Sequence, residues 1–137
     1  VVEAQRGRPR APDEVPRAMD EVAERPVERA RGATIQVLLG PDDGAPNFVT
    51  RCFALQPGGR IPCHRHDTIE HEQLVLAGEM VLGLDGDERT VRAGDCVLIP
   101  PGVAHWYENR GTVAVRFLCV VPRTADYRTE WLEPPAV

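Results

Sequence analysis

Turn residues divide the chain from residue 33 onward into short apolar runs, and this spacing restricts the possible fold more than any other feature. The runs are rich in β-branched residues and recur about every ten residues, a period typical of antiparallel strands. Asp85-Gly86 stands between two of them and predicts a two-residue hairpin. No convincing helical pattern lies among the runs. We therefore expect an all-β sandwich or barrel with strands over 34–39, 48–55, 71–77, 79–84, 88–92, 96–99, 104–108 and 112–121.

The length of 137 residues, 42% of them hydrophobic, is enough for one domain with a core of its own. Residues 1–32 differ from the rest because their four prolines exclude a long helix, although 18–25 could form two helical turns. We expect 1–32 to be an arm that could lie at a dimer interface, and 33–122 to form the barrel. Residues 123–137 would be a tail on the barrel or on a partner subunit, where Trp131 either covers a barrel mouth or docks on a neighbour.

Charge and hydropathy exclude several classes of partner. The net charge of −5 argues against a nucleic-acid partner. No apolar run approaches the ~20 residues of a membrane span, and the first residues lack the apolar block of a signal peptide. The four cysteines form no C-x-x-C pair, which predicts free thiols in a reducing, cytoplasmic setting.

All 16 basic residues are arginines. Without lysine the chain has no amine side chain for a Schiff base, so any chemistry on a carbonyl group must be activated in another way. A metal ion could supply that activation.

Three of the four histidines lie within eight residues, at His64, His66 and His71, and the fourth is His105. Imidazole is the commonest metal ligand near neutral pH, so the pattern predicts one metal site. Because side chains alternate across a strand, His64 and His66 share a face. By the same parity Gln73 lies beside His71, and Tyr107 beside His105. The six side chains expected to converge inside the barrel are therefore His64, His66, His71, Gln73, His105 and Tyr107.

Two linked motifs then resemble the cupin superfamily. Residues 58–78 read Gly-x5-His-x-His-x4-His-x6-Gly, which resembles the first cupin motif except that glutamate is usual at the place of His71. Residues 94–109 read Gly-x5-Pro-x-Gly-x2-His-x3-Asn and match the second motif at every defined position. The resemblance covers roughly 34–122. It implies a jelly-roll β-barrel, also called a double-stranded β-helix, with a central metal and commonly a homodimer.

The expected metal ligands are His64, His66, His71 and His105. Glu70 and Glu72 flank the glutamate position of the first motif, but both have the wrong strand parity. A bulge that brings Glu70 inward remains the alternative. Four neutral imidazoles leave the ion's charge uncompensated, which strengthens it as a Lewis acid. Zinc is favoured, although manganese, iron, nickel and copper also accept imidazole.

Three functions fit this site. The chain is similar in size and motif layout to small cupin-type polyketide cyclases, which implies metal-assisted aldol closure of a poly-β-ketone in aromatic polyketide (antibiotic) biosynthesis. The absence of lysine agrees with this interpretation, which we favour. Residues 45–49, followed by Arg51, instead resemble the entry strand of small manganese-binding cupins, which implies an iron- or manganese-dependent oxygenase that cleaves its substrate. A non-catalytic cupin that binds a small molecule is the third possibility.

The predicted catalytic residues are Gln73 and Tyr107. Gln73 would orient a water or substrate oxygen, or it would only be a buried polar group hydrogen-bonded to backbone. Tyr107 would donate a proton, or it would only form part of the wall of the site. Arg51 or Arg116, whichever faces the lumen, could hold an enolate or carboxylate. The more ordinary expectation for both arginines is a surface or interface ion pair.

Overall fold

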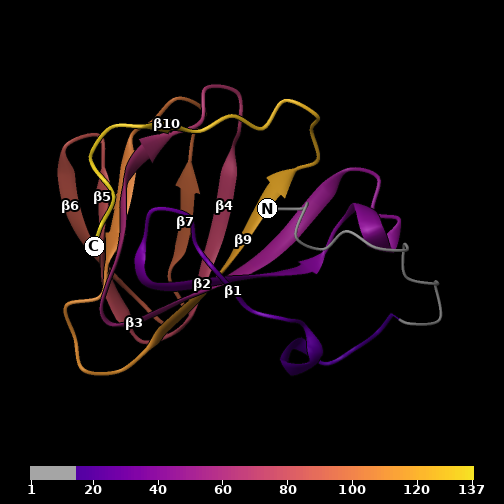
Figure 1. Cartoon of the computed structure of the whole chain (residues 1–137), viewed down its shortest axis with the longest axis horizontal. Coiled ribbons are helices and arrows are strands. Elements are labelled where there is room, and N and C mark those ends of the chain that lie inside the picture. The colour runs from indigo at the N-terminus through magenta and orange to yellow at the C-terminus, as the bar shows by residue number, and fades with distance from the viewer. Residues whose placement is uncertain (1–14) are drawn as a thin grey trace.

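The computed structural model describes residues 15–137, and residues 1–14 of the expected arm lie outside the described part. A single sheet curls round on itself in the order β6-β5-β8-β3-β9-β4-β7, with β2 and β10 also on β3 and β1 on β2 (Figure 1). Every pair is antiparallel, as expected. The strands are β1 (Arg25–Pro26), β2 (Arg31–Leu39), β3 (Phe48–Arg65), β4 (His71–Ala77), β5 (Glu79–Leu84), β6 (Asp87–Arg92), β7 (Cys96–Ile99), β8 (His105–Glu108), β9 (Val115–Pro122) and β10 (Glu130–Trp131).

The strand expected over 48–55 is much longer than predicted, because β3 runs for 18 residues. It passes through Pro57-Gly58-Gly59, a turn-forming sequence expected to end the strand. Gly58 has φ of +82°, a left-handed conformation that glycine adopts without strain. The Gly58 N–H donates to the Asn109 carbonyl at 2.8 Å, and the Asn109 N–H donates to the Gly59 carbonyl at 2.9 Å. The turn-forming sequence therefore bends the strand without ending it. The first half of β3 pairs with β2 and β9, and the second half with β8 and β10.

The other local predictions agree with the structure. Asp85 and Gly86, with φ of +48° and +88°, form the two-residue turn that joins β5 to β6. Along β4, buried and exposed side chains alternate from His71 onward, so parity sets which residues face the interior. On β8, His105 and Tyr107 are buried, whereas Trp106 lies on the other face. A Cβ added to Gly83, the partner of Trp106, would lie 1.9 Å from the indole nitrogen.

A core of buried apolar side chains fills the barrel and extends to the histidines. The ring of Phe117 stacks on Phe53 at 5.2 Å and on Tyr107 at 5.0 Å between centroids. Phe117, Leu55 and Val115 are completely buried. The core thus reaches as far as Tyr107, one of the predicted site residues.

The segments on either side of the barrel pack on it. The helical turns considered for 18–25 are reduced to one 3₁₀ turn, Met19–Glu21, because the chain is already extended at Val22. Gln36 on β2 donates from its amide to the carbonyls of Met19 and Val22, which satisfies both groups. At the other end of the chain, β10 pairs with β3 and crosses over one end of the barrel (Figure 1). No helix formed by residues 15–137 is long and apolar enough to span a bilayer.

Candidate functional site

Three imidazoles meet at one end of the barrel. His64 lies near the end of β3 and His66 just after it, while His105 begins β8 and pairs directly with His64. One nitrogen from each ring lies within 4.8 Å of the others, and all three side chains are buried. The long β3 explains this arrangement, because its second half is the strand on which β8 pairs. This geometry is compatible with a metal ion held by three histidines.

The three rings are also held in one tautomer, which leaves Nε2 of each free to bind a metal. The Nδ1 atoms of His64, His66 and His105 lie 2.7, 3.1 and 2.9 Å from the carbonyl oxygens of Pro62, Arg128 and Val103. A carbonyl oxygen only accepts hydrogen bonds, so each Nδ1 carries the proton and each Nε2 keeps a free lone pair. Such an outer acceptor is the usual partner of a metal-binding histidine. The donor set therefore fits a divalent ion.

The fourth histidine lies beside this group. The ring of His71 is 4.9 Å from that of His66 and 5.5 Å from that of His105, but its ring nitrogens are not part of the three-histidine cluster. Its Nε2 lies 3.5 Å from the Tyr127 hydroxyl, and its buried Nδ1 has no hydrogen-bond partner. Glu70, the alternative ligand, is exposed, and a hydrogen bond with Glu72 raises its pKa.

The histidines are neutral in the absence of a metal. Burial lowers the pKa of His66 to about 4, that of His105 to about 3 and that of His71 to about 2. Burial also lowers the pKa of His64. A histidine binds a metal only in the neutral form, so the rings need lose no proton at neutral pH before they can coordinate an ion.

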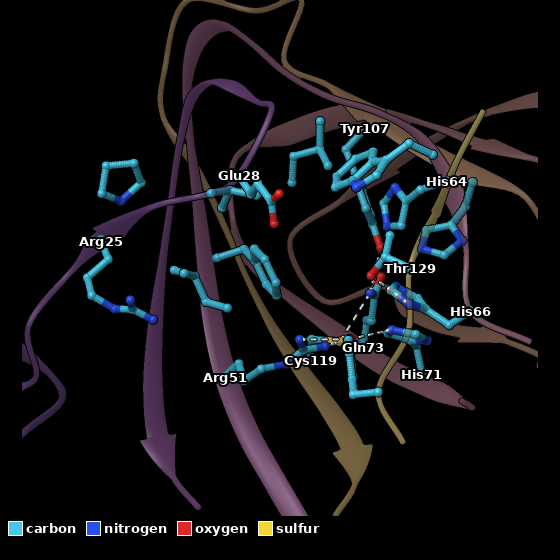
Figure 2. A pocket seen from close by; sticks show the side chains of 18 residues that line it. Arg25, Glu28, Arg51, His64, His66, His71, Gln73, Tyr107, Cys119 and Thr129 are labelled. Carbon is cyan, nitrogen blue, oxygen red and sulfur yellow. Dashed lines mark hydrogen bonds between the residues drawn. The ribbon is translucent and has the colours of Figure 1, made fainter. Parts of the chain in front are cut away.

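A cavity of about 260 Å³ opens beside the histidines, and Gln73 and Tyr107 line it as predicted (Figure 2). The Gln73 amide donates to the Tyr107 hydroxyl at 2.7 Å and to the Cys119 sulfur at 3.3 Å. The amide oxygen of Gln73 is buried without a partner. Burial raises the pKa of Tyr107, so its hydroxyl keeps its proton at neutral pH. Gln73 thus bonds to side chains rather than to backbone.

The structure separates the two candidate arginines. Arg51 lies on the inner face of β3, is 3% exposed and lines the cavity. Arg116 lies on the outer face of β9 and donates to Gln36 Oε1 at 3.3 Å and to Met19. The ordinary expectation of a surface ion pair is therefore wrong for Arg51, which alternates inward with Val49 and Phe53.

Three residues of the cavity come from the tail: the sequence singled out Trp131 as a candidate cover of a barrel mouth, but did not mark Tyr127 or Thr129. The ring of Tyr127 is tilted against that of His66, 4.9 Å away between centroids, and the Thr129 hydroxyl lies 3.2 Å from His66 Nδ1. The ring of Trp131 is 5.0 Å from that of His64, so this tryptophan lies against the site. No motif marks these residues, and only the pairing of β10 with β3 brings them here.

Comparison with known proteins agrees with this geometry. The family model described as "Cupin domain" matches residues 52–121, which hold both histidine motifs. The chain belongs to the cupin family. This cupin is therefore an all-β jelly roll of curled antiparallel strands, as its motifs predicted.

The relatives of this cupin include proteins of polyketide biosynthesis. It is 34% identical over 102 residues to protein SchB of Streptomyces halstedii, covering 74% of this chain and 72% of SchB. It is 32% identical over 104 residues to polyketide synthase CurC of Streptomyces cyaneus, covering 75% and 67%. The solved structure of the polyketide cyclase RemF from Streptomyces resistomycificus superposes with a TM-score of 0.76 at 32% identity, covering 86% of each chain.

Proposed function

We propose that this cupin is a metal-dependent polyketide cyclase that closes a ring in a poly-β-ketone by an aldol-type condensation, as part of aromatic polyketide biosynthesis. The observation that carries the proposal is one cavity that joins metal-competent imidazoles to Gln73 and Tyr107. Its similarity to RemF, which is described as a polyketide cyclase, and to CurC supports the choice of substrate class.

The proposed metal is zinc, held by His64, His66 and His105 with His71 as the fourth ligand. His71 lies next to His66 and His105, and its partnerless Nδ1 supports this role. When bound, the ion would supply Lewis-acid polarisation of a substrate carbonyl, which a chain without lysine cannot achieve through an imine. Four neutral ligands would leave the ion's full charge available for that purpose.

Gln73 and Tyr107 are the proposed catalytic residues. Because the Gln73 amide already donates to the Tyr107 oxygen, the Tyr107 proton is free to point at a substrate oxygen. The phenol can then donate a proton to the alkoxide that develops when an enol of the substrate forms the new carbon–carbon bond. The enol proton would pass to water in the cavity and from there to the Tyr107 phenolate, so that the protons balance. The partnerless Gln73 oxygen can accept a hydrogen bond from an enol or water in the cavity. Since much of the cavity is walled by buried side chains, such bonds would form with little competing water.

The direct test incubates the zinc-loaded protein with a linear poly-β-ketone and follows the aromatic product by absorbance and mass spectrometry. We expect ring closure that stops after chelation and returns with zinc. The matched pair His105→Ala and Glu70→Ala should separate a ligand from an exposed carboxylate. Full zinc loading without turnover would reject the cyclase and favour a binding protein.

A second candidate is an iron- or manganese-dependent oxygenase. Imidazole ligands accept either ion, and the inward position of Arg51 on the strand that resembles manganese-binding cupins favours this candidate over a binding protein. Metal analysis of the purified protein with an oxygen electrode distinguishes the two enzymes. Iron or manganese together with substrate-dependent oxygen uptake would replace the cyclase proposal.

We further propose that the protein is a cytoplasmic homodimer, with the barrel over 33–122 joined to its partner by the arm or by the outer sheet face. Leu74 and Leu98 are 38% and 57% exposed on neighbouring strands β4 and β7 and share that face. Exposed apolar groups of this kind commonly mark an interface. Analytical ultracentrifugation should give a dimer mass, and Leu98→Glu should shift it to the monomer.

A further inference from the structure

Arg51 is a buried cation that faces the cavity. Its guanidinium donates to the Tyr127 hydroxyl at 3.1 Å and to the Cys119 sulfur at 3.1 Å, while its Nε has no hydrogen-bond partner. The group also packs over the rings of Phe53 and Tyr127, 5.1 and 5.7 Å from their centroids. These contacts hold the guanidinium in a fixed position inside the barrel.

No carboxylate lies within ion-pair distance of Arg51 among residues 15–137. Other arginines of the described chain do have carboxylate partners, since Arg60 pairs with Glu133 and Arg65 with Glu130, each at 2.8 Å. The two partners of Arg51 are a phenol and a thiol instead. A buried charge without a counter-ion is strongly unfavourable, so a missing anion is the simplest reason to keep an arginine here.

We propose that Arg51 is the subsite for a carboxylate of the substrate, and that the substrate class is a free β-keto acid rather than a neutral ketone or ester. This inference deepens the proposed function and rests on it for the reaction that follows binding. The subsite itself depends only on Arg51 and its surroundings.

The charges of the cavity wall support an anionic ligand. Among the described residues that line it, Glu28 is the only carboxylate, against the two arginines Arg25 and Arg51, and the four histidines are neutral without a metal. In Figure 2, Glu28 lies on the opposite side of the pocket from His71. A divalent ion at the histidines would make the wall still more positive. A cleft of one charge sign concentrates ligands of the other sign.

The hydrogen bonds also connect this subsite to the proposed catalytic groups. Cys119 accepts from both Arg51 and Gln73 (Figure 2). The Tyr127 hydroxyl accepts from Arg51 and lies 3.5 Å from His71 Nε2. Arg51 is therefore one side chain away from Gln73 and one from His71. A small β-keto acid with its carboxylate on Arg51 leaves its ketone beside these groups.

Calorimetric titration with acetoacetate and with methyl acetoacetate tests the proposal, because the two probes share the ketone and differ in charge. The full chain is used after removal of metal with EDTA, so that binding does not require the loaded enzyme. We compare wild type with Arg51→Gln and with Arg116→Gln, a control that removes an arginine on the outer face. Arg51→Gln should weaken acetoacetate binding about 10- to 100-fold and leave the ester within about twofold. Arg116→Gln should change neither.

Equal acetoacetate affinity in wild type and Arg51→Gln would overturn the proposal. If that variant does not fold, a crystal structure of the wild type with acetoacetate tests the proposal instead. The carboxylate of acetoacetate must contact the Arg51 guanidinium, and any other position contradicts the subsite. If the protein closes the ring of a polyketone but binds acetoacetate equally well without Arg51, the subsite is rejected and the cyclase proposal stands. If acetoacetate binding depends on Arg51 but no ring closure occurs, the cyclase proposal is rejected and the subsite stands.

Discussion

The buried histidines should make the metal-free protein sensitive to mild acid. An unfolded histidine has a pKa near 6.5, whereas in the folded protein burial lowers the pKa of His66 to about 4, of His105 to about 3 and of His71 to about 2. At a pH between the unfolded and the folded pKa of a histidine, the unfolded chain binds a proton there that the folded chain does not. The free energy of unfolding must therefore fall as the pH falls below the unfolded pKa.

The size of the effect follows from proton linkage. From about pH 7.5 to about pH 5, each such histidine removes about 2 kcal/mol from the free energy of unfolding, so the three together remove about 6 kcal/mol. This is comparable with the whole stability of about 5 to 15 kcal/mol that is usual for a domain. His64, whose pKa is also lowered, acts in the same direction.

Urea unfolding of the EDTA-treated protein, followed by tryptophan fluorescence across this pH range, measures the loss. His105→Asn removes one titrating ring and should reduce the pH-dependent loss by about 2 kcal/mol, whatever its effect on stability at neutral pH. Added zinc should move the loss to lower pH, because bound metal keeps the rings unprotonated. A free energy of unfolding that stays constant down to about pH 5, or an identical loss in His105→Asn, would refute the argument.

Three further predictions concern single residues. His71→Ala should lower the affinity for zinc more than the loss of a residue that only hydrogen-bonds to a ligand, which typically costs about 10- to 100-fold, while Glu70→Ala should leave it unchanged. Dialysis followed by metal analysis measures both affinities, and equal losses in the two variants would reject His71 as a ligand. Tyr107→Phe should lower kcat for ring closure about 100-fold or more with zinc content retained, so an unchanged kcat would show that the phenol only forms wall. Gly83→Ala should cost about 1 to 3 kcal/mol by urea unfolding, because its Cβ would meet the indole packed against it at 1.9 Å. Gly111→Ala, whose nearest contact is 3.5 Å, is the control, and an equal loss there would contradict this reason.

Much of the barrel could be predicted because its signals are local. Turn chemistry requires only a few neighbouring residues, as at Asp85-Gly86, and parity follows from the alternation of a single strand. These two rules were enough to predict that Gln73 and Tyr107 face the cavity, as the structure shows. The same local rule failed at Pro57-Gly58-Gly59, because Asn109, far along the chain, supplies the hydrogen bonds that keep β3 continuous.

The sequence by itself determined the fold class, the family and the inward positions of the histidines. These follow from the spacing of turns and motif residues and from the alternation of side chains along a strand. Only the tertiary structure decided that Arg51 is buried without a carboxylate, that Arg116 lies outside, and that Tyr127 and Trp131 reach the site from the tail. The physical reason is how far apart along the chain the interacting residues lie. Alternation along a strand fixes which way a side chain points, but the charge or ring that it meets there depends on strands joined through long-range pairing.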